Sequence, residues 1–477
     1  MRPQPLMPNE AVLQSLRDVL GADGVLAGDD LAQRRHADWS GLPAAAPLAL
    51  LRPRSTQQVS QALAVCHRYR QPVVVQGGLS GLAGGACTQE GDVALSLERM
   101  NAIEEVDEAS GTMTVQAGVT LQAVQERAQD LGLMFALDLG ARGSCTIGGN
   151  LGTNAGGNRV IKYGMAREQV LDLEAVLADG RVVGGLRKMV KNNTGLDLKN
   201  LLIGSEGTLG VITRAVLRLR ALPGAAATAF CGLAGYDSVT ALLRRAQQCL
   251  PGGVSAFEVM WPGYYDYVMA KVPSVKPPLA GPHRYYVLLE STGGGRRHQE
   301  DFEQLLEDCL AQGIIEDAAV AATARDALAF WGVRDAPAEF PRLMPGLIAF
   351  DVSFSIRDIG VAAQTCADRL RANWPASTAL VYGHLGDGNL HLIVDVPGAT
   401  DAVAAQVEAM VYGLVGEYGG SVSAEHGIGL KKRQELGRTR SRADLDAMGA
   451  IKQALDPRNI LNRGKLFPDE VIGTSFY

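Results

Sequence analysis

Three glycine-dense tracts in the first 212 residues constrain the fold of this chain more than any other feature of its sequence. They span residues 77–85, 140–157 and 203–212, and serines, threonines and asparagines are interleaved with the glycines. The whole chain holds 56 glycines in 477 residues, against a usual share of about 7%. Glycine lets backbone N–H groups approach a ligand closely and adopt positive φ. One such tract is as consistent with tight turns, but three together favour a large phosphate-bearing cofactor.

The spacing of these glycines excludes two common nucleotide sites. None of the tracts has the G-x-G-x-x-G spacing of a dinucleotide fingerprint, and the chain has no G-x4-G-K-[ST] phosphate loop. Nicotinamide binding by the usual route and nucleoside triphosphate hydrolysis are therefore disfavoured.

Composition, charge and cysteine content narrow the class of protein further. Hydrophobic residues make up 47% and charged residues 20%, which is enough apolar material for large cores. The net charge of −6 gives no basic excess for nucleic acid. The seven cysteines form no C-x-x-C pair, so a disulfide framework or cysteine metal site is not expected. No apolar run approaches the ~20 residues of a membrane span, and residues 1–10 do not resemble a signal peptide. We expect a cytoplasmic protein.

Local patterns predict mixed helices and strands. The expected helices begin near a cap at Thr56, after Thr120 and near Ser441, with others at 238–249 and 297–311. The expected strands are 72–75, 93–97, 285–290, 347–354, 378–382 and 390–396, a hairpin of 170–177 with 181–183, and a β-like run at 420–424.

The first 220 residues resemble the FAD-binding domain of the vanillyl-alcohol oxidase and p-cresol methylhydroxylase type. The matching segments are RPRSTQQVS, VVVQGGLSGLAGG, GSCTIGGNLGTNAGG, KYG and IGSEGTLGVIT. The resemblance implies an α+β fold in which FAD lies between two subdomains. The glycine-rich loops contain no histidine, so a non-covalent FAD is expected. The implied cofactor-binding residues are Gln76, Gly77, Gly78, Leu79, Ser80, Gly81, Leu82, Gly140, Gly143, Ser144, Gly148, Gly149, Asn150, Gly152, Thr153, Asn154, Gly156, Gly207, Val211, Ile212 and Asn462.

Histidines gather in a second informative region. Three of the seven lie between residues 384 and 426. A strand, a Gly-Asp-Gly-Asn turn and a returning strand would place His384 and His391 at facing ends of a hairpin, and Glu425 and His426 open a glycine-rich turn. Two histidines and a carboxylate are a common ligand set for a divalent metal. Hydrogen-bonded histidines at strand ends are the simpler alternative, and the cluster favours a metal site.

The segments GHLGDGNLHL and GSVSAEHGIGLKK are similar to those of the FAD-linked 2-hydroxyacid dehydrogenases, most closely the D-2-hydroxyglutarate dehydrogenases and more distantly the D-lactate dehydrogenases. The resemblance implies a zinc-like ion on His384, His391 and Glu425, with manganese, iron and cobalt left open. It implies His426 as the base and Arg334 as the group that binds the substrate carboxylate. By sequence alone, an ion pair between Arg334 and Asp335 is an equal alternative.

Three positions depart from the hydroxyglutarate pattern. Ala338, Ala349 and Ile393 stand where that group carries threonine, lysine and asparagine. Each change replaces a polar group with an apolar one, and an unpaired carboxylate is costly to desolvate. The expected substrate is therefore D-2-hydroxyglutarate, D-lactate or a more apolar D-2-hydroxyacid.

The resemblance also implies the domain plan. We expect an FAD-binding domain at 1–222, an α+β substrate (cap) domain with the metal-binding hairpin at 223–424, and a segment at 425–477 that returns to the FAD domain. An electron-transfer flavoprotein or a quinone would accept the electrons, and a homodimer is plausible. The alternatives are a flavin subunit of a glycolate-oxidase-like complex and a non-redox flavoprotein of the alkyl-glycerone-phosphate synthase kind, which the histidine cluster argues against.

Overall fold

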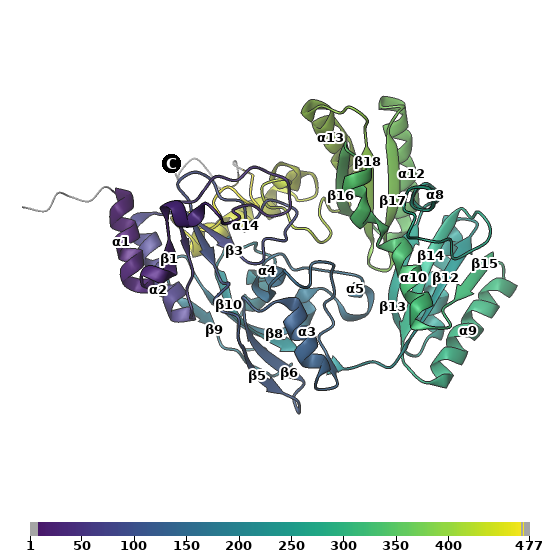
Figure 1. Cartoon of the computed structure of the whole chain (residues 1–477), viewed down its shortest axis with the longest axis horizontal. Coiled ribbons are helices and arrows are strands. Elements are labelled where there is room, and N and C mark those ends of the chain that lie inside the picture. The colour runs from purple at the N-terminus through teal and green to yellow at the C-terminus, as the bar shows by residue number, and fades with distance from the viewer. Residues whose placement is uncertain (1–7, 469–470, 472–477) are drawn as a thin grey trace, which may run out of the picture. The chain divides into compact units, whose positions relative to one another are not determined.

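The computed structural model describes residues 8–468 and 471, which form two units (Figure 1). Unit 1 comprises residues 1–157, 163–222 and 425–477, and unit 2 comprises residues 158–162 and 223–424. The chain thus passes from unit 1 to unit 2 at 222/223 and returns at 424/425. Residues 158–162, which directly follow the second glycine tract, also belong to unit 2.

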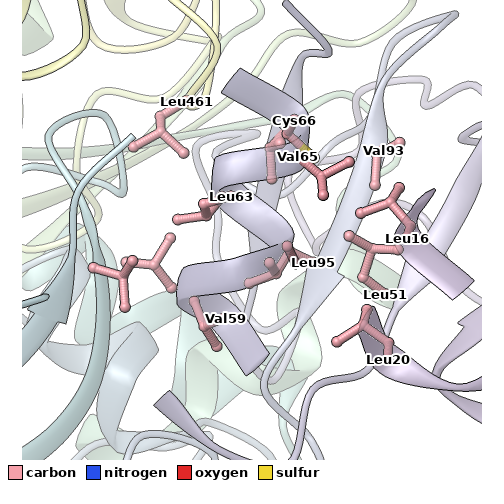
Figure 2. Packing of buried hydrophobic residues seen from close by; sticks show 14 of the residues in the cluster. Leu16, Leu20, Leu51, Val59, Leu63, Val65, Cys66, Val93, Leu95 and Leu461 are labelled. Carbon is pink, nitrogen blue, oxygen red and sulfur yellow. The ribbon is translucent and has the colours of Figure 1, made fainter. Parts of the chain in front are cut away.

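Unit 1 contains a small sheet of order β1-β2-β4-β3, in which β2, β4 and β3 are parallel. These strands are β1 (Val25–Leu26), β2 (Ala49–Leu51), β4 (Val93–Ser96) and β3 (Val73–Gln76). Helices α1 (Pro8–Leu20) and α2 (Thr56–Tyr69) bury leucine and valine side chains against it, and Figure 2 shows this core around α2. The helix α2 is capped by Ser55, whose side chain accepts from the Gln58 N–H, and not by the predicted Thr56. Serine is preferred over threonine as an N-cap, and Ser55 has the extended backbone that the cap position requires.

The second sheet of unit 1 is antiparallel and has the order β5-β6-β10-β8-β9. Its strands are β5 (Ile103–Asp107), β6 (Thr112–Gln116), β10 (Val211–Arg218), β8 (Val170–Val176) and β9 (Val182–Gly184), and the predicted hairpin is the pair β8–β9. Further elements are α3 (Leu121–Gln129), β7 (Leu133–Met134), α4 (Ile147–Gly152), α5 (Val160–Tyr163), α6 (Leu198–Leu202) and β11 (Arg220–Ala221). The predicted helix after Thr120 is α3, and the Thr120 side chain caps it.

The last segment of unit 1 returns to the first sheet. After α14 (Arg442–Leu455), Leu461 forms a parallel bridge with Val73 of β3. Leu461 is fully buried in the same core as α2 (Figure 2). Residues almost 390 positions apart in the sequence therefore share one sheet edge.

Unit 2 is built on a seven-stranded antiparallel sheet of order β15-β12-β14-β13-β17-β18-β16. Its strands are β12 (Ala226–Leu233), β13 (Val254–Met260), β14 (Tyr285–Thr292), β15 (Asp317–Val320), β16 (Leu347–Ser353), β17 (Thr378–His384) and β18 (Asn389–Asp395). One face carries an aromatic-rich core covered by α8 (Pro262–Lys271), α10 (Ala324–Arg334) and α11 (Phe340–Leu343). The pairs α7 (Tyr236–Cys249) with α9 (Arg296–Ala311), and α12 (Ile356–Asn373) with α13 (Asp401–Glu417), also pack on the strands.

The predicted strand at 420–424 is wrong. Only Ser421 bridges Ser353 of β16, and the segment otherwise has no regular structure. Gly420 lies so close to this strand that an added Cβ would stand 2.4 Å from the Ser353 carbonyl oxygen. The two segments therefore meet at one close bridge and do not form a ladder of hydrogen bonds. No helix among residues 8–468 is long and apolar enough to cross a membrane.

Candidate functional site

A cavity of about 460 Å³ lies within unit 1, and the three glycine tracts form most of its wall. Its volume falls in the ordinary range of ~300–1,000 Å³ for small-molecule sites. The expected cofactor residues that line it are Gln76, Gly77, Gly78, Leu79, Ser80, Gly81, Leu82, Gly140, Gly148, Gly149, Asn150, Gly152, Thr153, Gly156, Gly207, Ile212 and Asn462.

Four expected cofactor residues lie outside this lining. They are Gly143, Ser144, Asn154 and Val211. Val211 is fully buried in the core, since neighbouring residues of a strand face opposite sides. The Asn154 side chain accepts instead from the Arg167 N–H. None of the four lines the cavity. Gly143, Ser144 and Asn154 belong to the second glycine tract, and Val211 begins β10.

Glycines bring the first two tracts into direct backbone contact. A Cβ on Gly78 would stand 1.9 Å from the Ser144 carbonyl oxygen, and one on Gly77 would stand 2.6 Å from Thr146 Oγ1. Neither position has room for a side chain. Between them and Ser80, Leu79 adopts a φ of 54°, a left-handed conformation that is uncommon for leucine. The loop is thus fixed in one shape with its backbone turned to the cavity.

Unsatisfied polar atoms in the wall indicate a polar ligand. Thr146 Oγ1 and Asn150 Nδ2 are buried and have no hydrogen-bond partner in the part of the chain that the structure describes. Burying such groups without a partner costs about 1–3 kcal/mol each. A ligand that carries phosphate and hydroxyl oxygens would supply the missing partners, so the donor set fits FAD.

Asn462 closes the cavity from the C-terminal segment. Its Oδ1 accepts the Val75 N–H at 2.8 Å, and its Nδ2 donates to the Glu206 carbonyl oxygen. It therefore joins the end of β3 to the third glycine tract. Its side chain has a structural role in the wall, beside any contact with the cofactor.

The turn that follows Glu425 also belongs to this wall. Glu425 and His426 both line the cavity. The Glu206 carboxylate accepts the N–H groups of Ile428 and Gly429, each at 2.7 Å. Burial raises the pKa of Glu206, although these N–H donors and the nearby lysines 432 and 465 act to lower it. Sequence reasoning missed Glu206 as a site residue, since its only signal was its place inside the third tract.

The two expected metal-binding histidines lie together in unit 2. Tyr382 of β17 is directly opposite His391 of β18, so His384 is the diagonal neighbour of His391 on the same face. The centroids of the two imidazole rings are 5.1 Å apart. Asp351 of β16 faces His391 from the other side, with its Oδ1 3.9 Å from His391 Nδ1. The hairpin geometry expected from the sequence is present.

Glu258 of β13 orients His384 and Arg334. Glu258 lies directly opposite His384, and His384 Nδ1 donates to Glu258 Oε1 at 2.6 Å. Arg334, at the end of α10, donates from Nε to Glu258 Oε2 at 2.9 Å and from Nη2 to His384 Nε2 at 2.9 Å. Burial would raise the pKa of Glu258, but His384 and Arg334 outweigh it and lower that pKa to about 2.

These contacts show how the histidine pair fits a metal. A nitrogen that accepts from a guanidinium is unprotonated, so His384 Nε2 carries a lone pair. Arg334 Nη2 occupies that lone pair here and must leave it before a divalent cation can bind. Arg334 contacts Glu258 much more closely than Asp335, whose Oδ1 is 3.4 Å from Nη1. The alternative of a surface pair with Asp335 therefore does not describe its main interaction. Sequence reasoning missed Glu258, although a lone carboxylate in the apolar run VSAFEVM was a usable signal.

The three positions that depart from the hydroxyglutarate pattern lie in unit 2. Ala349 of β16 and Ile393 of β18 are directly opposite each other, two residues along from Asp351 and His391 on the same face. Ala338 is exposed in the short helical turn after Arg334. The strand pair two residues along from Asp351 and His391 is thus apolar.

Comparison with known families identifies both parts of the chain. Residues 47–184 match the family model described as an FAD binding domain, and residues 222–466 match the one described as the C-terminal domain of FAD linked oxidases. The expected FAD cofactor and α+β fold are thereby confirmed.

Similar proteins extend over almost the whole length. The chain is 35% identical over 453 residues to the mitochondrial D-2-hydroxyglutarate dehydrogenase of Arabidopsis thaliana, covering 95% of this chain and 80% of that protein. It is 37% identical over 438 residues to the D-2-hydroxyglutarate dehydrogenase of Xanthomonas citri, covering 90% and 91%. A p-cresol methylhydroxylase structure matches with a TM-score of 0.75 at 17% identity, covering 96% of each chain, and an alkyldihydroxyacetonephosphate synthase with 0.72 at 17%, covering 97% and 86%. These two structures share its fold.

Proposed function

This chain belongs to the family of FAD-linked oxidases, and from that premise we propose that it is a dehydrogenase that oxidises a D-2-hydroxyacid to the 2-oxoacid. The observation that carries the proposal is the wall of the unit 1 cavity, where the glycine tracts meet Glu425 and His426. A flavin cradle and a residue able to accept a proton thus share one cavity. The similarity to D-2-hydroxyglutarate dehydrogenases over 90–95% of the chain supports the same reaction class.

The chemistry requires a proton to leave a hydroxyl while a hydride leaves the same carbon. When bound, FAD supplies the hydride acceptor at N5 and a divalent cation supplies positive charge that lowers the pKa of an adjacent hydroxyl. An imidazole nitrogen of His426 accepts the hydroxyl proton, because histidine exchanges protons near neutral pH. The turn that carries His426 is fixed by the two hydrogen bonds to Glu206, which limits its freedom to move away.

We assign the metal to His384, His391 and Glu425. The two histidines are adjacent in unit 2. Nε2 of His384 is unprotonated and binds the cation when Arg334 Nη2 leaves its lone pair. Glu425 follows directly after Ala424, whose N–H donates to the carbonyl oxygen of Asp351 beside His391. Covalent continuity therefore keeps Glu425 near the same strand ends. Two nitrogens and one carboxylate suit zinc and also manganese, iron or cobalt.

Arg334 binds the substrate carboxylate in this proposal. Its side chain is 14% exposed and lies beside His384. A guanidinium can hold a carboxylate through two parallel hydrogen bonds. The opposed pair of Ala349 and Ile393 gives no charge for a second carboxylate at those positions. D-2-Hydroxyglutarate remains a candidate by similarity, and D-lactate or a more apolar D-2-hydroxyacid fits this pair better.

Anaerobic reduction of the flavin tests this proposal. The purified yellow protein is mixed with D- and L-forms of lactate, malate, 2-hydroxyglutarate, mandelate and longer aliphatic 2-hydroxyacids. Absorbance is followed near ~450 nm, where oxidised flavin bleaches on hydride transfer. We expect bleaching by D-acids only, its loss after chelation and its return with a divalent metal. His426→Asn should slow it by about 10²–10⁴-fold with the flavin still bound, since a general base contributes that much.

The outcomes separate the parts of the proposal. Bleaching that persists after chelation would remove the metal role of His384, His391 and Glu425. An L-acid preference would overturn the assigned stereochemistry. Absence of bleaching with every acid would favour a flavin subunit that needs partner subunits. An electron-transfer flavoprotein and a quinone are then compared as oxidants of the reduced protein, since either suits a dehydrogenase of this kind.

A further inference from the structure

The geometry points to Glu258 as a positioning residue that sets both the metal-binding nitrogen of His384 and the direction of the Arg334 guanidinium. This inference rests on the proposed function, because it gives His384 and Arg334 the roles stated there. It concerns a residue of β13 that contributes to the site only through its two neighbours.

The strand register places the Glu258 carboxylate where it must interact with His384. The two residues are direct partners across β13 and β17, so their side chains leave the same face of the sheet. The His384 ring is 5% exposed and the Glu258 side chain 1% exposed. A carboxylate without hydrogen bonds at that depth would be strongly unfavourable. The hydrogen bond between Glu258 and His384 therefore follows from the register of β13 and β17.

The two carboxylate oxygens of Glu258 have separate partners. Oε1 accepts from His384 Nδ1, and Oε2 accepts from Arg334 Nε. The first bond requires the tautomer with hydrogen on Nδ1, which leaves the lone pair on Nε2. Outer carboxylates of this kind fix the ring orientation of metal-binding histidines and increase their basicity. The second bond fixes the plane of the guanidinium, so that Nη2 lies beside Nε2 of the same histidine.

Other contacts hold the far side of Arg334. The guanidinium carbon lies 5.6 Å from the centroid of the Tyr382 ring, within cation–π range. The Tyr264 hydroxyl donates to the carbonyl oxygens of Val333 and Arg334 and so fixes the end of α10. Tyr382 is in turn the strand partner of His391. Glu258 thus forms hydrogen bonds both to the proposed metal-binding histidine and to the proposed substrate arginine.

The test is Glu258→Gln in the full-length flavoprotein. An amide has one acceptor oxygen and one donor NH₂ in place of two acceptor oxygens. It satisfies either His384 or Arg334 and presents a donor to the other. If the NH₂ faces His384, the ring must protonate Nε2 and lose the lone pair. We expect a 10–100-fold loss of affinity for Zn²⁺, measured by competition with a chromogenic chelator, because outer carboxylates of metal-binding histidines contribute about that much.

Substrate kinetics supply the second readout. We expect the KM for the best D-2-hydroxyacid to rise at least about tenfold at saturating metal, because the guanidinium loses its charged partner. Flavin content and the melting temperature of flavin release should stay unchanged, since the flavin cavity belongs to unit 1.

Glu290→Gln is the matched control. Glu290 is a buried carboxylate on neighbouring β14, where it accepts from Ser255 Oγ and from Trp331 Nε1 of the same helix α10. Its hydrogen bonds and its ion pair reach Ser255, Trp331 and Arg159, not His384 or Arg334. This variant should keep both Zn²⁺ affinity and KM, so it reports the general effect of losing a buried charge in unit 2.

The outcomes are distinct. If the unmodified protein binds no Zn²⁺, the metal part of the proposed function fails and this inference fails with it. If the unmodified protein binds Zn²⁺ and Glu258→Gln matches Glu290→Gln in both measurements, the inference alone is overturned. Should Glu258→Gln fail to fold, Glu258→Asp decides the matter. It keeps the charge and both acceptors with a shorter reach, and equal Zn²⁺ affinity and KM to the Glu290→Gln control would overturn the inference.

Discussion

At the scale of single residues, the cavity of unit 1 depends on positions where a side chain cannot be present. Gly78→Ala is expected to weaken FAD binding by at least about tenfold, because its Cβ would stand 1.9 Å from the Ser144 carbonyl oxygen and force the two tracts apart. Overpacking of this kind costs about 1–3 kcal/mol. Flavin retained after dialysis against graded FAD concentrations measures the loss.

Gly140→Ala is the control for this substitution. Gly140 lines the same cavity, yet a Cβ there would meet nothing within 4 Å, and its φ is not positive. Its FAD affinity should stay within a factor of about three. Equal losses in both variants would mean that tract mobility, and not the contact with Ser144, controls binding.

The sequence predicted the role of a residue where that residue belongs to a local motif. Gly77 and Gly78 were identified because they directly follow a predicted strand, and the structure places both in the wall of the cavity. Glu258 and Glu206 were missed, because each acts through a partner more than 120 positions away. The register of β13 and β17 creates the contact of Glu258, and the return of the C-terminal segment to unit 1 creates that of Glu206. A local sequence pattern predicts neither of these arrangements.

At the scale of secondary structure, the buried side chain of Lys452 joins α14 to the C-terminal segment and to the third glycine tract. Lys452, at the end of α14, donates to Asp456 Oδ2 at 2.6 Å and to the carbonyl oxygens of Thr208 and Leu461, both at 2.9 Å. Lys452→Met should destabilise unit 1 by about 3–5 kcal/mol, because it leaves the buried Asp456 without its cation. The midpoint of urea-induced flavin release measures this change.

An exposed pair on the same helix provides the comparison. Arg442 Nε contacts Asp446 Oδ1 at 2.9 Å, and both side chains are more than half exposed. Arg442→Met should change the same midpoint by less than about 1 kcal/mol, as exposed ion pairs usually do. A loss in Lys452→Met as small as this would show that the other contacts of the segment, including those of Leu461 and Asn462, hold it without Lys452.

The sequence predicted α2, α3, α7, α9 and α14 and many of the strands, but not the long helices α12 and α13 or the strands β12 and β13. Two further segments show why local patterns fail. Residues 147–152 form α4 despite three glycines, because packing of Ile147 and Leu151 in the core outweighs low helix propensity. Residues 420–424 contain alternating small and apolar residues but cross β16 only once. In both cases tertiary packing decided between conformations that the local pattern left close in energy.

At the scale of the whole molecule, the two units have separate cores and only unit 1 holds the flavin cavity. Added FAD should therefore raise the unfolding midpoint of unit 1 alone. At 100 times the dissociation constant the expected stabilisation is about 2.7 kcal/mol. Flavin fluorescence reports release from unit 1, and tryptophan fluorescence follows unit 2, which holds three of the four tryptophans.

Adenosine monophosphate at the same concentration serves as the control, because it lacks the isoalloxazine ring and the ribityl chain. Equal shifts of both transitions with FAD would show that the two units unfold as one cooperative body. The overall plan of an FAD-binding domain followed by an α+β domain was predictable from the resemblance. The antiparallel order of the second sheet and the assignment of residues 158–162 to unit 2 were not predicted.

The late return of the chain to β3 has a consequence for how the protein is made. Translation runs from the N-terminus at about 5–20 residues per second, so every residue of unit 2 emerges before Leu461 can pair with Val73 and Asn462 can close the cavity. A nascent chain is therefore expected to stay colourless until its synthesis is nearly finished. Cellular flavin supply then acts on completed polypeptides, and a message truncated before codon 461 yields a protein that vitamin supplementation cannot rescue.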